Sequence, residues 1–173
     1  MKKMAISVTT ALLLAACSDK PPATIKDIDS HIVSTTEIKD GERSVLKITW
    51  KSDNISPESD MNIAVSGINQ IIRGIVTQLP NEHADEVHII INSSLTDKYG
   101  NQSRADTLDI PFSMSEVRKI NFASNTFTQW DLINLSEQPK LLHNAGKQLM
   151  AAYCTNETYA KYAQRFCLKG LRL

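Results

Sequence analysis

Apolar residues recur along the first third of the chain with the spacing of β-strands. The alternation is clearest in residues 44–52, where the apolar positions are Leu46, Ile48 and Trp50. A looser alternation runs through residues 25–38, and Asp40-Gly41 supplies a turn signal between the two stretches. The pattern predicts a β-hairpin whose second strand is half-buried.

A second pair of strands is predicted further along the chain. Residues 87–95 form an apolar run, and apolar residues alternate again at Leu108, Ile110 and Phe112. Residues 97–101 read as the turn between them. Ile90 lies on the face opposite to its apolar neighbours, which indicates a central strand covered on both sides. Pro111 cannot donate to a ladder, so it is expected at an edge or near a strand end.

Between these hairpins, apolar residues take the spacing of one broad helix face. They are Met61, Ala64, Val65, Ile68, Ile72, Ile75, Val76 and Leu79. Ser56 is the expected N-cap, Pro57 fits the first helical position, and Pro80-Asn81 ends the helix. Gly67 and Gly74 are expected where the helix closely approaches the sheet.

Two shorter helices complete the prediction. The capping-box pattern Ser113-Met114-Ser115-Glu116 opens a helix to about Phe122, and another is expected from Glu137 to Tyr153. Four strands in two hairpins, with helices between and after them, predict an α+β fold. Its sheet is small and mostly antiparallel, with the helices packed on one face.

The N-terminal segment has the layout of an export signal. Lys2 and Lys3 precede an apolar stretch, residues 4–16, that is too short to span a membrane. The stretch ends Leu14-Ala15-Ala16-Cys17, which resembles the lipobox of bacterial lipoproteins. The resemblance implies a signal peptide over 1–16, cleavage before Cys17, and a lipid on that cysteine.

The same resemblance implies a location. A lipidated cysteine with two or more acyl chains anchors stably to a membrane. By similarity to enterobacterial sorting signals, Ser18 favours the outer membrane facing the periplasm, whereas Asp19 weakens that preference in favour of the inner membrane. Residues 17–26, with Pro21-Pro22, are expected to form a stiff lipidated tether, and 27–173 a single α+β domain.

Export places the remaining cysteines, Cys154 and Cys167, in an oxidising compartment, which favours a disulfide. The aromatic residues between them have helical spacing, and an unbroken helix would hold the pair about 20 Å apart at about 1.5 Å per residue. A disulfide needs Cα atoms within about 7 Å. Either the chain reverses between the cysteines and they are bonded, or they are two free buried thiols; the compartment favours the bond.

Charge and residue types exclude several function classes. The full chain has 19 basic and 19 acidic residues, and removal of Lys2 and Lys3 with the signal leaves a slight acidic excess. This balance is not that of a nucleic-acid-binding protein. His83 and His88 are five residues apart, which is not a metal-ligand spacing on a helix or strand. We therefore expect neither a metal nor another cofactor.

One arrangement suggests a hydrolase, namely Ser93-Ser94 near Asp97, Asp106 and Asp109. No Gly-x-Ser-x-Gly elbow accompanies these residues, and polar residues flanking a hairpin explain them without catalysis. No phosphate loop or dinucleotide fingerprint is present either. The expectation is that the protein is not an enzyme.

Two groups of aromatic residues are candidates for a binding surface, although core packing is the better interpretation of both. One is the polar loop that carries Phe122, Phe127 and Trp130; the other is the C-terminal stretch with Tyr159 and Tyr162. The leading expectation is an anchored, non-enzymatic module that binds another envelope protein. The alternative is a periplasmic protein that binds a small ligand or a cell-wall fragment.

Overall fold

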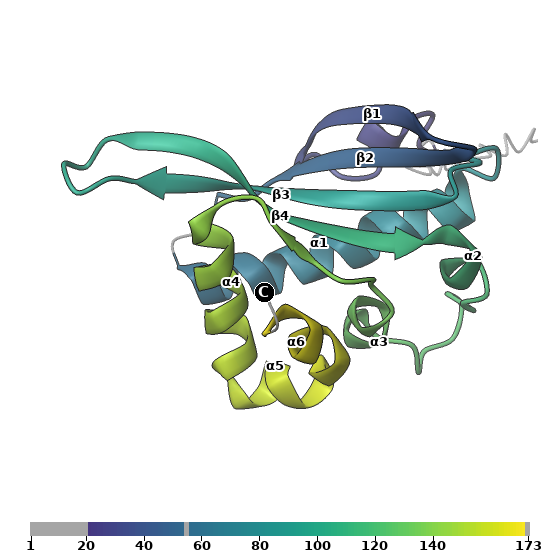
Figure 1. Ribbon diagram of the computed structural model, residues 1–173. Coiled ribbons are helices and arrows are strands. Elements are labelled where there is room, and N and C mark those ends of the chain that lie inside the picture. The colour runs from purple at the N-terminus through teal and green to yellow at the C-terminus, as the bar shows by residue number, and fades with distance from the viewer. Residues whose placement is uncertain (1–20, 54–55, 172–173) are drawn as a thin grey trace, which may run out of the picture.

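The computed structural model describes residues 21–53 and 56–171, which form an α+β fold with one five-stranded sheet (Figure 1). The strands are β1 (Ile32–Asp40), β2 (Arg43–Lys51), β3 (Glu86–Thr96), β4 (Gln102–Ser113) and β5 (Lys140–Leu141). The helices are a short 3-10 helix η1 (Ile25–Asp27), α1 (Pro57–Gln78), α2 (Met114–Val117), α3 (Gln129–Asn134), α4 (Asn144–Thr155), α5 (Glu157–Tyr162) and α6 (Gln164–Gly170).

Both predicted hairpins are present, and the strands lie side by side in chain order. β1–β2, β3–β4 and β4–β5 pair antiparallel, whereas β2–β3 pair parallel, with α1 as the crossover between them. The prediction of about four strands was one short. The fifth strand pairs only Lys140 and Leu141 with Asp109 and Leu108, which is too short to show an alternating pattern.

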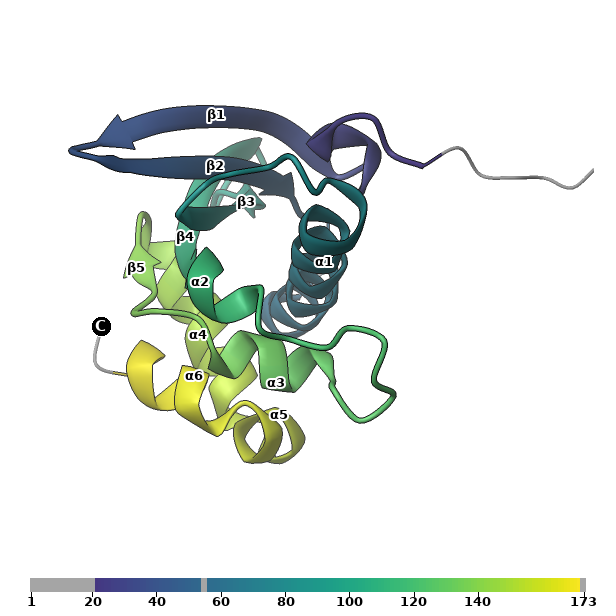
Figure 2. The same ribbon diagram turned by 90° about the vertical axis from the view of Figure 1, so that its right-hand side faces the viewer.

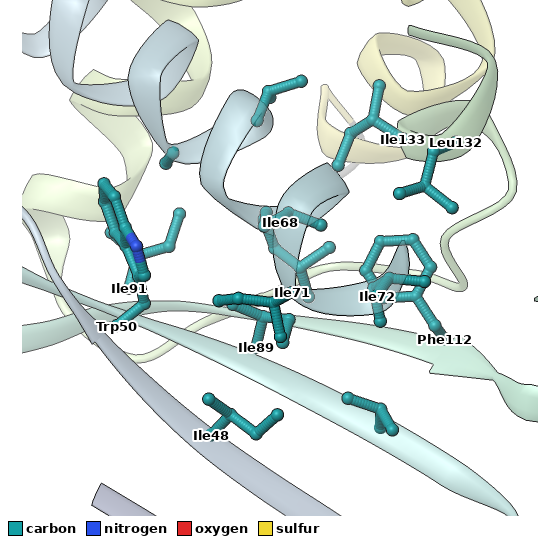
Figure 3. Close-up of a cluster of buried hydrophobic side chains, with 14 of the residues drawn as sticks. Ile48, Trp50, Ile68, Ile71, Ile72, Ile89, Ile91, Phe112, Leu132 and Ile133 are labelled. Atoms are coloured by element: carbon teal, nitrogen blue, oxygen red, sulfur yellow. The ribbon is translucent and has the colours of Figure 1, made fainter. Parts of the chain in front are cut away.

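The helices α1 to α6 lie on one side of the sheet, and the other side is open (Figure 2). Ile90 faces this open side and is half-buried, so the prediction that β3 is covered on both faces was wrong. The hydrophobic core fills the space between the sheet and α1, where large apolar side chains from both meet (Figure 3). Each such side chain contributes about 1.5–3 kcal/mol when fully buried.

Helix α1 begins and ends close to the predicted positions. Its N-cap Ser56 accepts a hydrogen bond from the backbone N–H of Ser59 at 3.3 Å. A methyl group added at Gly67 would lie 2.9 Å from the Trp50 ring, so the predicted close approach to the sheet is confirmed there. Gly74 instead approaches Ile28, which follows η1. A methyl group added at Gly74 would lie 2.6 Å from the Ile28 side chain.

The two shorter predicted helices differ from the structure at their boundaries. The helix that begins at Met114 ends at Val117 rather than near Phe122, and Ser113 makes no capping bond from its side chain. The helix predicted from Glu137 begins at Asn144, after β5. Pro139 accounts for the later start, because it biases the preceding residue towards an extended backbone.

A buried carboxylate fixes the N-terminal segment against the sheet. Asp29 accepts hydrogen bonds from the Trp50 ring N–H at 3.2 Å and from the backbone N–H of His31 at 2.8 Å. Ile25 packs against the core, and residues 23–26 lie beside residues 78–82 at the C-terminal end of α1. The described chain therefore enters the domain at that end of α1.

Candidate functional site

The most prominent surface feature is a two-stranded arm, defined as residues 93–106, in which β3 and β4 continue past the rest of the sheet (Figure 1). β2 stops at Lys51, opposite Asn92, so β3 has no neighbour on its outer side beyond that point. β5 pairs with only two residues of β4, nearer its C-terminal end. Both outer edges of the arm are therefore unpaired in the described structure.

The tip of the arm is a tight turn held by one side chain. The carboxylate of Asp97 accepts from the backbone N–H groups of Tyr99 at 2.8 Å and Asn101 at 2.9 Å, and from the Asn101 side chain at 2.9 Å. These bonds, with that from the Asn101 side chain foremost, hold the pKa of Asp97 below its usual value. Gly100 has φ +84°, a conformation that favours glycine. The turn displays Tyr99, whose exposure is 77%.

At the base of the arm, Arg104 ties both strands to the end of β2. Its guanidinium donates to the Asn92 side chain at 2.7 Å and backbone carbonyl at 2.5 Å, to the Ser52 carbonyl at 2.6 Å, and to the Asp53 carboxylate at 2.8 Å. Charged hydrogen bonds that share one rigid group restrict movement of the strands that they join. The arm is therefore held in a fixed direction although it lacks neighbouring strands.

We expect Arg104→Ala to loosen the arm without unfolding the domain. Loss of these bonds removes about 1.5 kcal/mol from local stability, which corresponds to about tenfold faster amide exchange in residues 93–106. Hydrogen exchange followed by NMR measures this effect. Arg73→Ala is the control, because in the described structure the Arg73 side chain makes no hydrogen bond. Equal exchange rates in the two variants would contradict this role for Arg104.

The aromatic residues singled out from the sequence take part in three pairs of contacting rings. Trp130 of α3 stacks on Tyr162 of α5 at a ring distance of 5.1 Å, and Tyr159 stacks on the buried Tyr153 at 4.8 Å. Phe122 and Phe127 pair edge to face at 5.7 Å. The loop and C-terminal groups, separate in the sequence, are thus brought together at Trp130 and Tyr162.

Burial distinguishes packing residues from surface residues among these five. Phe122 is buried; Phe127, Trp130 and Tyr159 are half-buried; Tyr162 is 49% exposed. Phe127 also lines an open hollow of about 580 Å³ between α3, α6 and the loop after α2. The core interpretation therefore fits Phe122, whereas Phe127 and Tyr162 reach the surface.

On the open face of the sheet, a nearly buried histidine lies between two carboxylates. His88 Nδ1 lies 3.0 Å from Asp109 Oδ2 on β4, and Nε2 lies 3.4 Å from Glu86 on its own strand. The hydrogen bond with Asp109 is the main reason that the pKa of His88 is raised, and burial and Lys140 of β5 oppose this shift. Both ring nitrogens face carboxylates, and in the described part of the chain neither has a hydrogen bond with a hydroxyl or thiol that it could activate.

Protonated His88 is expected to stabilise the fold at acidic pH. Because the pKa of His88 is raised in the folded state, protonated His88 contributes its full stabilisation at pH values below its unfolded-state pKa of 6.5. This stabilisation is lost as the pH rises through the folded-state pKa. Unfolding free energies of the native chain and His88→Gln, measured by urea denaturation between about pH 5 and pH 9, should differ most at the acidic end. A difference that grows with pH would contradict this sign.

Four of the five residues that suggested a hydrolase have a structural partner instead, and the fifth, Ser94, is exposed on the arm. Ser93 Oγ lies 3.0 Å from Thr107 Oγ1, and Asp106 accepts a hydrogen bond from Asn92 at 2.7 Å. Asp97 holds the arm turn, and Asp109 pairs with His88. Within residues 21–53 and 56–171, no group of three or more histidine, cysteine or acidic side chains is placed to hold a metal.

The predicted disulfide is confirmed between Cys154 and Cys167, whose Cα atoms are 5.5 Å apart. The chain reverses because α4 ends at Thr155 and α5 restarts at once, with Asn156 accepting from the N–H groups of Thr158 and Tyr159. The proposed lipid site Cys17 lies outside the described residues. Among the described helices, none is long and apolar enough to cross a membrane.

Sequence reasoning missed the arm and the residue that holds it. The turn Asp97 to Asn101 was recognisable, but the flanking Ser, Thr, Asn and Gln residues show no alternation of apolar and polar positions. The only signal was the run of polar residues on both sides of a good turn.

No protein-family model matches the chain, and neither a characterised protein nor a solved structure matches it.

Proposed function

We propose that this protein is a bacterial envelope lipoprotein, anchored through a lipid on Cys17, whose domain binds another envelope protein. Binding is non-enzymatic, and the contact element is the arm formed by residues 93–106. Sorting by Ser18 places the protein on the outer membrane, facing the periplasm. The observation that carries this proposal is an arm that is held rigid at its base and displays an exposed tyrosine at its tip. Tyrosine is enriched in interfaces because it contributes much contact area at little entropic cost.

The geometry of the domain supports this role. The described chain enters beside the C-terminal end of α1, whereas the arm starts beside the N-terminal end, where Ser56 and Pro57 share a small cavity with residues 93–95. A helix of 22 residues spans about 33 Å. From there the arm extends still further away from the C-terminal end of α1 (Figure 1). An anchor at the N-terminus would hold Tyr99 far from the bilayer, within reach of a neighbouring protein.

Unprotected strand edges also favour a protein partner. Proteins usually protect exposed strand edges with lysine, proline or a bulge. Residues 93–106 contain no proline, and their only lysine is Lys98 at the turn. The other long edge strand, β1, has a bulge between Ile32 and Ser34. The β3–β4 pairing has such an irregularity too, but it lies at the base of the arm, between Ile91 and Asn92, so the backbone groups along the arm beyond it are available to a partner.

The test is crosslinking in intact cells with a photoreactive amino acid in place of Tyr99. The matched control carries it in place of Leu168, which is 55% exposed on α6. We expect one envelope protein to be captured from position 99 and not from position 168, and its yield to fall in an Arg104→Ala background. The same set of abundant neighbours from both positions would overturn the role of the arm.

Anchoring is tested separately with Cys17→Ser. The native chain should incorporate labelled palmitate and sediment with membranes, because multiple acyl chains bind a bilayer stably. The variant should do neither. Retention of the label by Cys17→Ser would show that the lipobox assignment is wrong, whatever the crosslinking result.

A second candidate function, binding of a small periplasmic ligand or a cell-wall fragment, is favoured by one observation. The hollow beside Phe127 has about 580 Å³ of space, which is within the range of small-molecule sites.

A further inference from the structure

The hollow beside Phe127 has a wall suited to an apolar group. Ile120, Leu135 and Phe127 line it, and Phe127 is held in place by its edge-to-face contact with Phe122. Small-molecule sites usually combine such apolar walls with a few polar groups that fix orientation. The polar groups of this hollow therefore decide what it can bind.

Most polar groups around the hollow already have partners within the protein. Asn134 donates to the Tyr162 carbonyl at 2.7 Å and accepts from the Phe166 N–H at 3.1 Å. These two bonds fix the start of α6, and with it Arg165, beside α3. The exposed Arg165 side chain also lines the hollow, and in residues 21–53 and 56–171 its guanidinium has neither a hydrogen bond nor an ion pair.

A carboxylate is also present on the lining. Asp131 caps α3, where one of its oxygens accepts from the backbone N–H of Thr128 at 2.8 Å and from its hydroxyl at 2.7 Å. This oxygen is fully used, but the negative charge stays beside the hollow. A ligand that carried only negative charge would be attracted by Arg165 and repelled by Asp131.

We propose that the hollow binds a zwitterion with an apolar side group, of the class of a free apolar amino acid. Its carboxylate pairs with Arg165, its ammonium group faces Asp131, and its side group lies against Phe127. Arg pairs with a carboxylate through two parallel hydrogen bonds, which gives orientation as well as affinity. This site is additional to the protein-binding arm and does not depend on it.

The test is an NMR titration of the mature chain carrying Cys17→Ser, with phenylalanine as the probe. We expect saturable shifts at residues 120–135 and 162–166 below about 10 mM, the range of weak small-ligand sites. Phenylalaninamide, which lacks the carboxylate, should bind at least about tenfold more weakly, as should phenylalanine to Arg165→Gln. N-acetylphenylalanine, which lacks the ammonium group, should also bind more weakly.

Lys161→Gln is the matched control, because Lys161 lies over the Tyr162 ring and does not line the hollow. The Lys161→Gln variant should bind phenylalanine with the same affinity as the native chain. Equal binding of phenylalaninamide, an unchanged affinity in Arg165→Gln, or no saturable shift at these residues would each overturn the proposal. Since none of these changes touches the arm, failure here leaves the crosslinking result at Tyr99 unaffected.

Discussion

Replacing Cys154 and Cys167 together with alanine should lower the free energy of unfolding by about 3 kcal/mol, the effect of opening a loop of this length in the chain-entropy model. The bond joins residues 13 apart in sequence and connects α4 with α6. Between them the chain turns twice, after Thr155 and at Ala163, where the side chains of Asn156 and Asn134 also bond to the backbone. The loss should therefore be concentrated in α4 to α6.

Urea denaturation of the oxidised chain, the reduced chain and the double variant measures this effect. Reduction should reproduce the loss seen in the variant, because both remove the same crosslink. Alanine is preferred to serine because both positions are buried, Cys167 at 5% exposure and Cys154 at 9%. A loss below about 1 kcal/mol would mean that the packing of α4 to α6 is sufficient without the bond.

Trp50→Ala should destabilise the protein by about 3–5 kcal/mol, the usual cost of removing a large core aromatic side chain. Trp50 is 1% exposed, lies against Gly67 of α1, and donates to the buried Asp29. Gly67→Ala alone should also destabilise, by about 1–3 kcal/mol, because the added methyl group would overlap the ring.

The double variant distinguishes the effect of the Trp50–Gly67 contact from a general loss of core packing. Once Trp50 is removed, the methyl group of Gly67→Ala enters the space that the ring occupied, and alanine also favours helix over glycine by about 1 kcal/mol. Gly67→Ala should then become neutral or stabilising in a chemical denaturation experiment. The control pairs Gly67→Ala with Trp130→Ala, where the two losses should add. Additivity with Trp50→Ala as well would refute the contact.

The parts of the fold that were predictable are those whose burial repeats at a fixed period. Strand β2 and helix α1 place apolar residues at every second position or along one helix face, and both end at recognisable signals. The same reasoning failed for β5, which has only two residues, and for the start of α4 after Pro139. Short elements form because of their tertiary contacts, and such contacts produce no periodic pattern of apolar residues in the sequence.

The candidate sites were less predictable because they depend on single contacts between distant residues. Trp130 and Tyr162 meet because the Asn134 side chain bonds to the Tyr162 carbonyl, across 28 residues of sequence. Arg104 reaches Asp53 across 51 residues. Neither residue type nor spacing predicts such a bond. The sequence therefore indicated which aromatic residues were candidates for a binding surface without showing which of them contact one another.

The order of the strands has a consequence for how the molecule assembles. Because β1 to β5 lie in the sheet in the order in which they occur in the chain, each strand has its neighbour already available when the chain emerges N-terminus first. No strand needs to insert between two that are already paired. The sheet can grow by addition at one edge, and oxidation of the two cysteines, which lie after all the strands, then secures the C-terminal helices last.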